Sequence, residues 1–353
     1  MNRGDRVAGR LDGIDALLVT EPTNLRYVTG FTGSNGFAVV GPQVRRFVTD
    51  FRYVEQAKLE VPDFDREQGS QELLAALGRG LEGVQRLGFD DAHVSVRTHR
   101  RLGELLPPHV ELVPAAGVIE DVRAVKEPGE ILRIGAAAAL VDEIYAWLLE
   151  LGLVGRTERE VAVALEHEMR LRGASGPSFD SIVAAAENGA LPHASPRDVP
   201  IGADTLVTID IGAVLDGYCS DCTRTWATGA SLPGELEEIY ALVLRAQVTA
   251  LDAVRPGPLG REIDAIGRDI IEAAGHGEHF GHGLGHGVGL VTHEAPRLSR
   301  TGTAALVPGN VVTVEPGVYV PGLGGVRIED LVVVTEDGRD VLSKTTKDLL
   351  TVE

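Results

Sequence analysis

The segment TLVTIDIGAVLDGYCSDCTRT, residues 205–225, contains two β-rich runs on either side of Asp216-Gly217. An Asp-Gly pair suits the positive φ angles of a two-residue hairpin turn. We therefore expect a β-hairpin in which Leu215 pairs with Tyr218.

The same register would place Gly212 opposite Asp221. Because side chains alternate along a strand, Asp210 shares a face with position 212 and lies one diagonal step from Asp221. The pattern predicts that both carboxylates point into one space.

A second pair of acidic residues lies in NVVTVEPGVYVPGLGGVRIEDLVVV, residues 310–334. A Pro-Gly-rich connection joins two apolar runs, and the runs carry Glu315 and Glu329, so a second hairpin is expected. Four clustered carboxylates repel one another and lose hydration on burial, unless divalent cations neutralise them. The two segments together indicate a metal site.

A neutral ligand is expected from FGHGLGHGVGLVTHEAP, residues 280–296, which contains His282, His286 and His293. We assign the ligand role to His286. The alternating glycines make a poor helix, which argues against a zincin helix and favours an extended loop. We expect these glycines to let substrate or metal approach the main chain.

Each feature alone has an ordinary alternative. A single Asp in a strand, such as Asp210, is usually a turn or hydrogen-bonding residue, and Arg327-Ile328-Glu329 alone would suit an exposed edge strand. The Gly-His run alone would suit a mobile loop or an adventitious metal binder. Two hairpins with acidic residues in phase and a histidine between them favour the metal site.

The only cysteines, Cys219 and Cys222, form a C-x-x-C pattern within the first hairpin. Reactive pairs prefer a helix N-terminus, and two thiols alone cannot complete a structural zinc site. We interpret both as structural.

The composition suits a soluble enzyme of two domains. The chain has 353 residues, with 33 Lys plus Arg against 52 Asp plus Glu, a formal charge of −19. This charge disfavours nucleic acid and anionic membranes as partners. No apolar run approaches the roughly 20 residues of a membrane span, and the N-terminus lacks the apolar core of a signal peptide, so we expect a cytoplasmic protein.

A charged stretch with Pro128-Gly129 divides the chain into domains 1–124 and 125–353. In the first, alternating apolar residues predict an α/β sheet with strands in 15–20, 36–41, 45–50, 86–90 and 109–115, layered by helices such as 70–83. The second repeats one order of elements, helix-helix-sheet, which predicts two similar halves around one site. Its expected helices are 130–151, a helix opened by the Thr157/Glu160 capping box, 234–254 and 260–274.

The chain resembles the proline-specific metallopeptidases prolidase (Xaa-Pro dipeptidase) and aminopeptidase P. The motifs HASP, DIGAVLDGYCSDCTRT, GHGLGHGVGLVTHE, VEPGVYVP and GVRIED carry the resemblance in the C-terminal domain. NLRYVTGFTGSNG and TDFRYVEQA resemble a creatinase-type N-terminal domain. The resemblance implies an α+β protein with a small creatinase-like domain followed by a pita-bread domain of two pseudo-symmetric halves.

It also implies ligand roles. Asp210 would chelate one metal ion, Asp221 and Glu329 would bridge two, and His286 with Glu315 would complete the second ion's sphere. A hydroxide bridging the ions would attack the scissile carbonyl, with Glu315 as proton acceptor. Two divalent ions per subunit are expected, Mn²⁺ first from family habit, with Co²⁺ or Zn²⁺ as alternatives.

The resemblance assigns further roles to His193, His282, His293 and Arg327. The family's histidines at such positions stabilise the oxyanion or hold substrate, and an arginine suits a carboxylate or carbonyl oxygen. Orientation of Glu329 by Arg327 is an equal alternative for the arginine.

The expected activity is hydrolysis of the peptide bond before proline by an Xaa-Pro dipeptidase, with aminopeptidase P acting on longer peptides as the alternative. The N-terminal domain argues against a methionine aminopeptidase, and the five ligand types argue against a non-hydrolytic, creatinase-like relative. A homodimer is expected from the resemblance.

Overall fold

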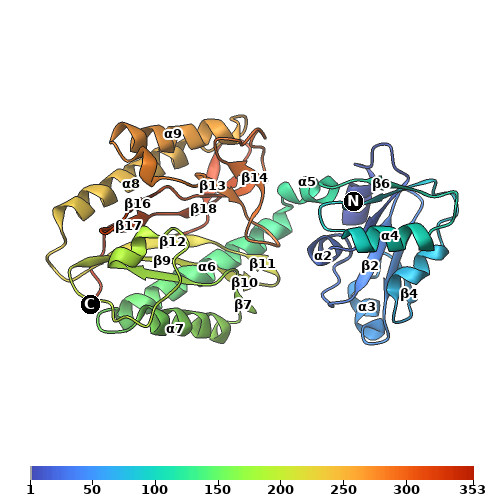
Figure 1. The fold of residues 1–353 in the computed structure, drawn as a ribbon, viewed down its shortest axis with the longest axis horizontal. Coiled ribbons are helices and arrows are strands. Elements are labelled where there is room, and N and C mark those ends of the chain that lie inside the picture. Colours follow the sequence, from blue (N-terminus) through green and yellow to red (C-terminus); the bar gives the residue numbers. More distant parts are fainter. Residues whose placement is uncertain (1) are drawn as a thin grey trace. The chain divides into compact units, whose positions relative to one another are not determined.

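The computed structural model describes residues 2–353, which form two compact units that meet in the sequence between Arg123 and Ala124 (Figure 1). Each unit has its own sheets and its own hydrophobic core. Within residues 2–353 no helix is long and apolar enough to cross a membrane.

The first unit is built on one six-stranded sheet in the order β4-β3-β2-β1-β5-β6. Strand β1 pairs antiparallel with β2 on one side and parallel with β5 on the other. The elements are α1 (Arg3–Ala8), β1 (Ala16–Val19), α2 (Pro22–Thr29), β2 (Gly36–Val40), β3 (Arg45–Thr49), α3 (Val54–Glu60), β4 (Asp65–Gln68), η1 (Leu73–Gly78), β5 (Arg86–Phe89), α4 (Val96–Leu105), β6 (Glu111–Pro114) and α5 (Val118–Ala124).

All five strands expected in this unit are confirmed, but the helix expected at 70–83 is wrong. Only a 3₁₀ helix, Leu73–Gly78, forms there. Gly80 and Gly83 have φ angles of +72° and +84°, which an α-helix excludes, so the chain turns where the apolar pattern continues. The polar edge strand β4 carries no apolar alternation and gave no sequence signal.

The second unit contains the two predicted halves. In Figure 1, α8 and α9 lie on one side of its sheets, and α6 and α7 lie on the other. The first half contains α6 (Pro128–Leu151), α7 (Glu158–Leu171), β7 (Gly176–Pro177), β8 (Ile182–Ala185), η2 (Ala186–Ala190), β9 (Thr205–Ile211), β10 (Ala213–Leu215), β11 (Tyr218–Cys219) and β12 (Cys222–Thr228). The predicted capping box is confirmed, since Thr157 and Glu160 each accept a hydrogen bond from the other's backbone N–H.

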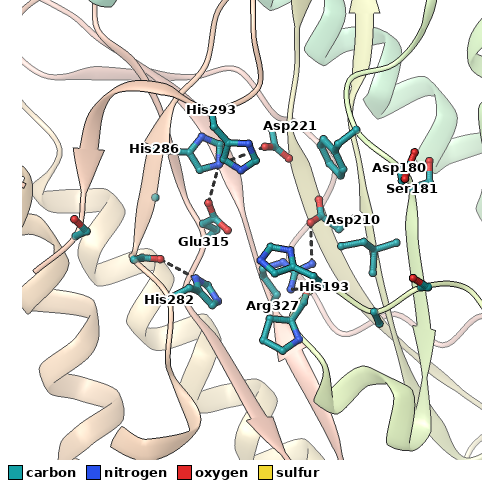
Figure 2. Close-up of a pocket in the computed structure, with 18 of the residues that line it drawn as sticks. Asp180, Ser181, His193, Asp210, Asp221, His282, His286, His293, Glu315 and Arg327 are labelled. Carbon is teal, nitrogen blue, oxygen red and sulfur yellow. Dashed lines mark hydrogen bonds and ion pairs between the residues drawn. The ribbon is translucent and has the colours of Figure 1, made fainter. Parts of the chain in front are cut away.

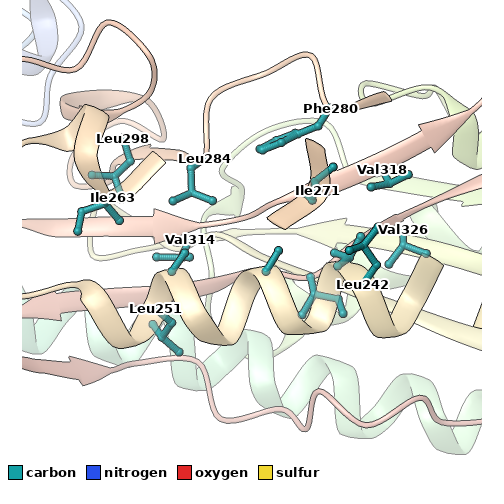
Figure 3. Packing of buried hydrophobic residues seen from close by; sticks show 14 of the residues in the cluster. Leu242, Leu251, Ile263, Ile271, Phe280, Leu284, Leu298, Val314, Val318 and Val326 are labelled. Atoms are coloured by element: carbon teal, nitrogen blue, oxygen red, sulfur yellow. The ribbon is translucent and has the colours of Figure 1, made fainter. Parts of the chain in front are cut away.

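The second half repeats the order with its own core. Its elements are α8 (Gly234–Ala253), α9 (Gly260–Ala273), η3 (Gly277–His279), β13 (Gly285–Gly287), β14 (Glu294–Leu298), β15 (Val311–Val314), β16 (Gly317–Val320), β17 (Gly324–Arg327), β18 (Asp330–Val334) and β19 (Arg339–Val341). Leu242 and Leu251 of α8 belong to a buried cluster with Ile271 of α9 and with Val314 and Val318 of the strands (Figure 3). Burial of each such side chain contributes about 1.5–3 kcal/mol, so this core fixes the strands that carry the second acidic pair.

The first predicted hairpin has the expected register. Leu215 pairs with Tyr218, and Ile211 pairs with Cys222, which brackets Gly212 opposite Asp221. Asp216 and Gly217 both have positive φ, +50° and +82°. The turn chemistry read from the sequence is confirmed.

The second hairpin is interrupted where its glutamates lie. Val314 pairs with Asp330, and Gly317 pairs with Arg327, in the same register. Between these pairs the backbone N–H of Glu315 donates to Leu284 O (2.8 Å) and that of Glu329 donates to Thr223 O (3.1 Å). The second hairpin is therefore tied to the histidine loop and to the first hairpin at its two acidic residues.

Candidate metal centre

Three carboxylates of the two hairpins meet in the second unit, Asp210 from β9, Asp221 from the link before β12 and Glu329 from the link before β18. Ligand oxygens of Asp210, Asp221 and Glu329 all lie within 4.8 Å of one another. The residues are 9%, 5% and 1% exposed. The predicted convergence of both hairpins is present in the structure.

This group is not neutralised by the protein alone. Burial and the neighbouring carboxylates raise the pKa values of Asp221 and Glu329 well above the ordinary range. Asp210 Oδ1 and Glu329 Oε1 are buried without a hydrogen-bond donor. Buried anionic oxygens without donors are costly, so the donor set fits divalent cations that would supply the missing positive charge.

His286 lies beside this group with its tautomer set by the backbone. Its Nδ1–H donates to Gly287 O (3.1 Å), while Nε2 lies 3.1 Å from Glu315 Oε1 and 3.6 Å from Asp221 Oδ2 (Figure 2). The register of β13 and β14 shifts between His286 and Gly287, and such bulges redirect a side chain. Nε2 is therefore the ring nitrogen directed towards the carboxylates, as a metal-ligating histidine requires.

Glu315 is held ionised by its neighbours. Burial alone would raise its pKa, but the hydrogen bond and charge of His286 outweigh it and lower the pKa to about 2. Thr313 Oγ1 also donates to Glu315 Oε1 (2.9 Å), and the same hydroxyl accepts from the His286 backbone N–H (3.0 Å). The hydroxyl fixes both residues in one arrangement.

Arg327 holds Asp210. Its Nη2 donates to Asp210 Oδ2 (2.8 Å), and its Nε donates to Thr223 Oγ1 (3.0 Å). Thr223 in turn donates to Glu329 Oε2 (2.7 Å). Arg327 thus contacts Asp210 directly and orients Glu329 through the threonine hydroxyl.

A second chain of hydrogen bonds leads from Arg327 to His282. Nη1 of Arg327 donates to the Tyr319 hydroxyl (2.8 Å), which lies 2.9 Å from His282 Nε2. His282 Nδ1–H donates to Gly283 O (2.8 Å). Both ring nitrogens of His282 are therefore engaged. Tyr319 lies in the motif VEPGVYVP but was not singled out, because a neutral tyrosine within an apolar run usually only packs in a core.

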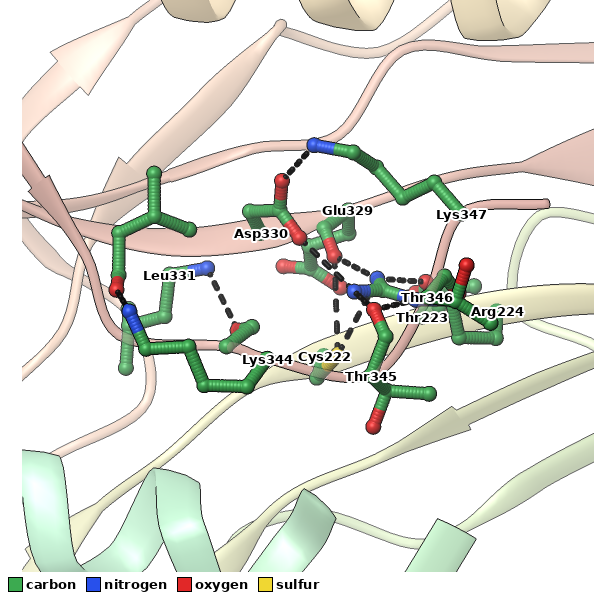
Figure 4. A network of polar contacts seen from close by, with 12 residues as sticks. Cys222, Thr223, Arg224, Glu329, Asp330, Leu331, Lys344, Thr345, Thr346 and Lys347 are labelled. Carbon is green, nitrogen blue, oxygen red and sulfur yellow. Dashed lines mark hydrogen bonds and ion pairs between the residues drawn. The ribbon is translucent and has the colours of Figure 1, made fainter. Parts of the chain in front are cut away.

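A buried arginine, Arg224, holds the backbone of the metal-site residue Glu329. Arg224 forms an ion pair with Asp330 (2.9 Å), and the two side chains are 1% and 0% exposed. Arg224 also donates to the carbonyls of Glu329, Thr345 and Thr346 (Figure 4). It therefore joins β12, β18 and the segment that follows them.

Asp210, Asp221 and Glu315 border a cavity of about 550 Å³. His193 and His293 also line it, and both are exposed. The ring of His293 lies 4.2 Å from that of His286, centroid to centroid. The five expected ligands and the four expected substrate-side residues thus gather in one region.

Arg297 lines the same cavity and was missed from the sequence. It is exposed and forms no ion pair with any residue in 2–353. It lies in β14, directly after the histidine loop, where an isolated arginine gives no signal. Only the folded arrangement shows that it lines the cavity.

Two glycines of the histidine loop are required by neighbouring strands. A Cβ at Gly285 would lie 2.0 Å from Thr313 O of β15, and one at Gly287 would lie 2.2 Å from Ala295 O of β14. Gly283 and Gly285 also line the cavity, where we expected the main chain to be open to substrate or metal. The expectation of an extended loop is confirmed.

The two cysteines are buried thiols. Burial raises the pKa of Cys222 far above that of a reactive thiol, and its Sγ lies 3.6 Å from Glu329 O. This supports the structural interpretation of the pair.

Comparisons with known proteins agree with the geometry. Residues 133–336 match "Metallopeptidase family M24", and residues 8–125 match "Creatinase/Prolidase N-terminal domain". An Xaa-Pro dipeptidase of Pyrococcus furiosus is 37% identical over 96% of each chain.

Solved structures agree over almost the whole chain. An Xaa-Pro dipeptidase from Bacillus anthracis superimposes with a TM-score of 0.96, 39% identity and 99% coverage of both chains. An X-Pro aminopeptidase from Thermotoga maritima superimposes with a TM-score of 0.92 and 32% identity, over 99% of this chain and 100% of that chain. The resemblance and the fold class expected from the sequence are confirmed, and the chain belongs to metallopeptidase family M24, as a metal-dependent hydrolase with a creatinase/prolidase N-terminal domain.

Proposed function

We propose that this enzyme is an Xaa-Pro dipeptidase. The observation that carries the dipeptidase assignment is Arg297, a cavity-lining cation without an acidic partner in the described part of the chain. In an Xaa-Pro dipeptide, the proline directly after the scissile bond carries the free carboxylate. A permanently charged guanidinium on the cavity that holds the proposed metal ligands would suit this carboxylate better than the continuing chain of a longer peptide.

The proposed metal ligands are those that meet at the centre: Asp210, Asp221, His286, Glu315 and Glu329. Two divalent ions, Mn²⁺ in our proposal, would activate a bridging water as the nucleophile and polarise the scissile carbonyl. The unpartnered oxygens of Asp210 and Glu329 support this assignment.

Glu315 is the proposed general base. Oε1 accepts from Thr313 and lies against His286, while Oε2 takes no hydrogen bond from residues 2–353. Oε2 can therefore accept a proton from the attacking water and deliver it to the proline nitrogen, which has no proton of its own in the peptide bond.

The remaining residues divide into two groups. His193 and His293 are exposed to the cavity and are proposed to hydrogen-bond the substrate carbonyl as charge develops on it. Arg327 and His282 are proposed to position other groups, because protein acceptors take four of the five Arg327 N–H groups and both His282 ring nitrogens are engaged. One Arg327 N–H remains for substrate.

The similarity to the Thermotoga X-Pro aminopeptidase structure keeps aminopeptidase P as the second candidate. The proposal also includes a homodimer and a cytoplasmic location, on the grounds given by the sequence.

The test compares Ala-Pro, Ala-Pro amide and Ala-Pro-Ala after metal removal and addition of Mn²⁺. A dipeptidase cleaves Ala-Pro best, and Arg297→Ala should raise KM for Ala-Pro about 10- to 100-fold, the value of a charged hydrogen bond, while leaving the amide unchanged. Arg300→Ala is the matched control, since Arg300 is exposed and pairs with Glu272. Preference for Ala-Pro-Ala would move the assignment to aminopeptidase P.

A further inference from the structure

The first unit has its own candidate ligand site, at the point where the order of the strands in its sheet reverses. From β1 the chain continues to β2 on one side, and it later returns to β5 on the other side, with β6 beyond. Strands β1, β5 and β6 are parallel, so their carboxyl ends lie at one edge. In open α/β sheets, ligands bind in the crevice at such a switch point.

Three potential metal ligands converge at this edge. Asp90 follows β5 directly, His93 lies in the next turn, and Glu120 comes from α5. One ligand atom of each lies within 4.8 Å of the others. The residues come from separate elements, so their convergence is a property of the fold and not of a local acidic run.

Asp90 is the residue that indicates a missing ligand. It is only 8% exposed, and its Oδ2 is buried without a hydrogen-bond donor. His93 Nε2 lies 3.8 Å from this oxygen, which is too long for a hydrogen bond. Burial and the charge of Glu120 raise the pKa of Asp90, so the surroundings do not stabilise its anion.

The space beside Asp90 has room for one small occupant. A cavity of about 10 Å³, close to the volume a single water needs, is lined by Asp90, Glu120, Glu21 and Asn24 among others. Asn24 is already engaged, since it donates its backbone N–H to Glu21 (2.6 Å) and its side-chain amide to Glu120 Oε1 (2.6 Å). Three acidic residues, Glu21, Asp90 and Glu120, thus line a very small space.

We propose that Asp90, His93 and Glu120 bind one divalent transition-metal ion, separate from the peptidase centre. Two carboxylates and one imidazole form a mixed oxygen and nitrogen set, which suits Zn²⁺ and Mn²⁺. The ion would occupy the place of the missing donor at Asp90 Oδ2. Its binding would link the end of β5 to α5 and leave coordination positions for water.

The experiment measures Zn²⁺ binding to the full-length, metal-stripped chain by equilibrium dialysis with the metal alone. The wild type should bind three ions per chain, two at the peptidase centre and one at Asp90, His93 and Glu120. In His93→Ala and in Asp90→Asn, the affinity for this third ion should be at least tenfold weaker, so that each variant binds one ion fewer under the same conditions. His93 has a half-exposed side chain, 52%, so its replacement should not disturb folding. His109→Ala, an exposed histidine of the same unit, should match the wild type.

A second measurement identifies the ligand directly. In protein with ¹³C-labelled histidine, the His93 ring resonances should shift on addition of Zn²⁺ to the wild type and stay unchanged in Glu120→Gln. Equal Zn²⁺ content in the wild type and His93→Ala, or a His93 signal that does not shift on addition of Zn²⁺, would overturn the proposal.

Discussion

The two hairpins of the second unit carry equivalent acidic pairs but hold them differently. In the first, pairing stops between Val214/Cys219 and Ile211/Cys222 without a change of register, and hydrogen bonds between Ala213 and Ser220 of the same hairpin bridge the gap beside Asp221. In the second, pairing stops between Val314/Asp330 and Gly317/Arg327, because Pro316 has no N–H to donate. One hairpin is defined by its own turn, and the other depends on its neighbours.

Each hairpin also holds an acidic ligand of the other through a hydrogen bond. Asp210 of the first hairpin accepts from Arg327 of the second, and Glu329 of the second accepts from Thr223 of the first. The comparison shows that neither hairpin contains a complete site, so metal binding depends on the packing of one half against the other.

Loss of a carboxylate of the first hairpin should have the largest effect. Asp221→Asn removes an anionic ligand next to Asp210 and Glu329. We expect loss of bound metal and no measurable turnover, checked by elemental analysis and Ala-Pro hydrolysis. Asp180→Asn, an exposed carboxylate on the same cavity, should keep its metal; a fully metallated, active Asp221→Asn would contradict the ligand assignment.

Glu315→Gln tests the second hairpin. The amide can still accept from Thr313, so the fold should be retained, while the proton acceptor is lost. We expect kcat to fall about 10²- to 10⁴-fold, the usual contribution of a general base. Circular dichroism checks the fold, and unchanged kcat would remove Glu315 from the base role.

Thr223→Val tests the hydrogen bond by which the first hairpin holds Glu329 of the second. It removes the hydroxyl between Arg327 and Glu329 without a change in shape. Metal affinity should fall about 10- to 100-fold, as for other partners of metal ligands. Thr249→Val, an exposed threonine on α8, is the control; equal affinities in both variants would mean that the two hairpins support their ligands independently.

The smallest effect is expected from pH. The pKa values of Asp221 and Glu329 are raised in the metal-free fold, so that state is stabilised at low pH and loses stability as pH rises through the raised values. Metal requires the ionised forms, so its affinity should increase with pH. The gain in Tm on adding Mn²⁺ should therefore grow from acidic to neutral pH; a constant gain would contradict the raised values.

Much of this arrangement was predictable where local chemistry decides it. The Asp-Gly turn determined the register of the first hairpin, and the 3.6-residue periodicity located α6, α8 and α9. The second hairpin was predicted only as a hairpin, since its interruption depends on Leu284 and Thr223 from other segments.

The rest depends on tertiary packing. Tyr319 and Thr223 lie within quoted motifs and Arg297 follows the histidine loop, but only the fold shows which hydrogen bonds the first two make and that the third lines the cavity. The sequence also did not show that a Cβ at Gly285 or Gly287 would clash with β15 and β14, because that depends on how these strands pack beside the histidine loop.

Arg224 also has a consequence for shortened forms of the protein. Its guanidinium is held by the carbonyls of Thr345 and Thr346, which lie beyond the end of both hairpins. A chain shortened to end at Lys344 would contain both hairpins but leave the buried Arg224 without these acceptors, next to the backbone of Glu329. We therefore expect such a shortened protein to retain its metal less firmly than the full chain.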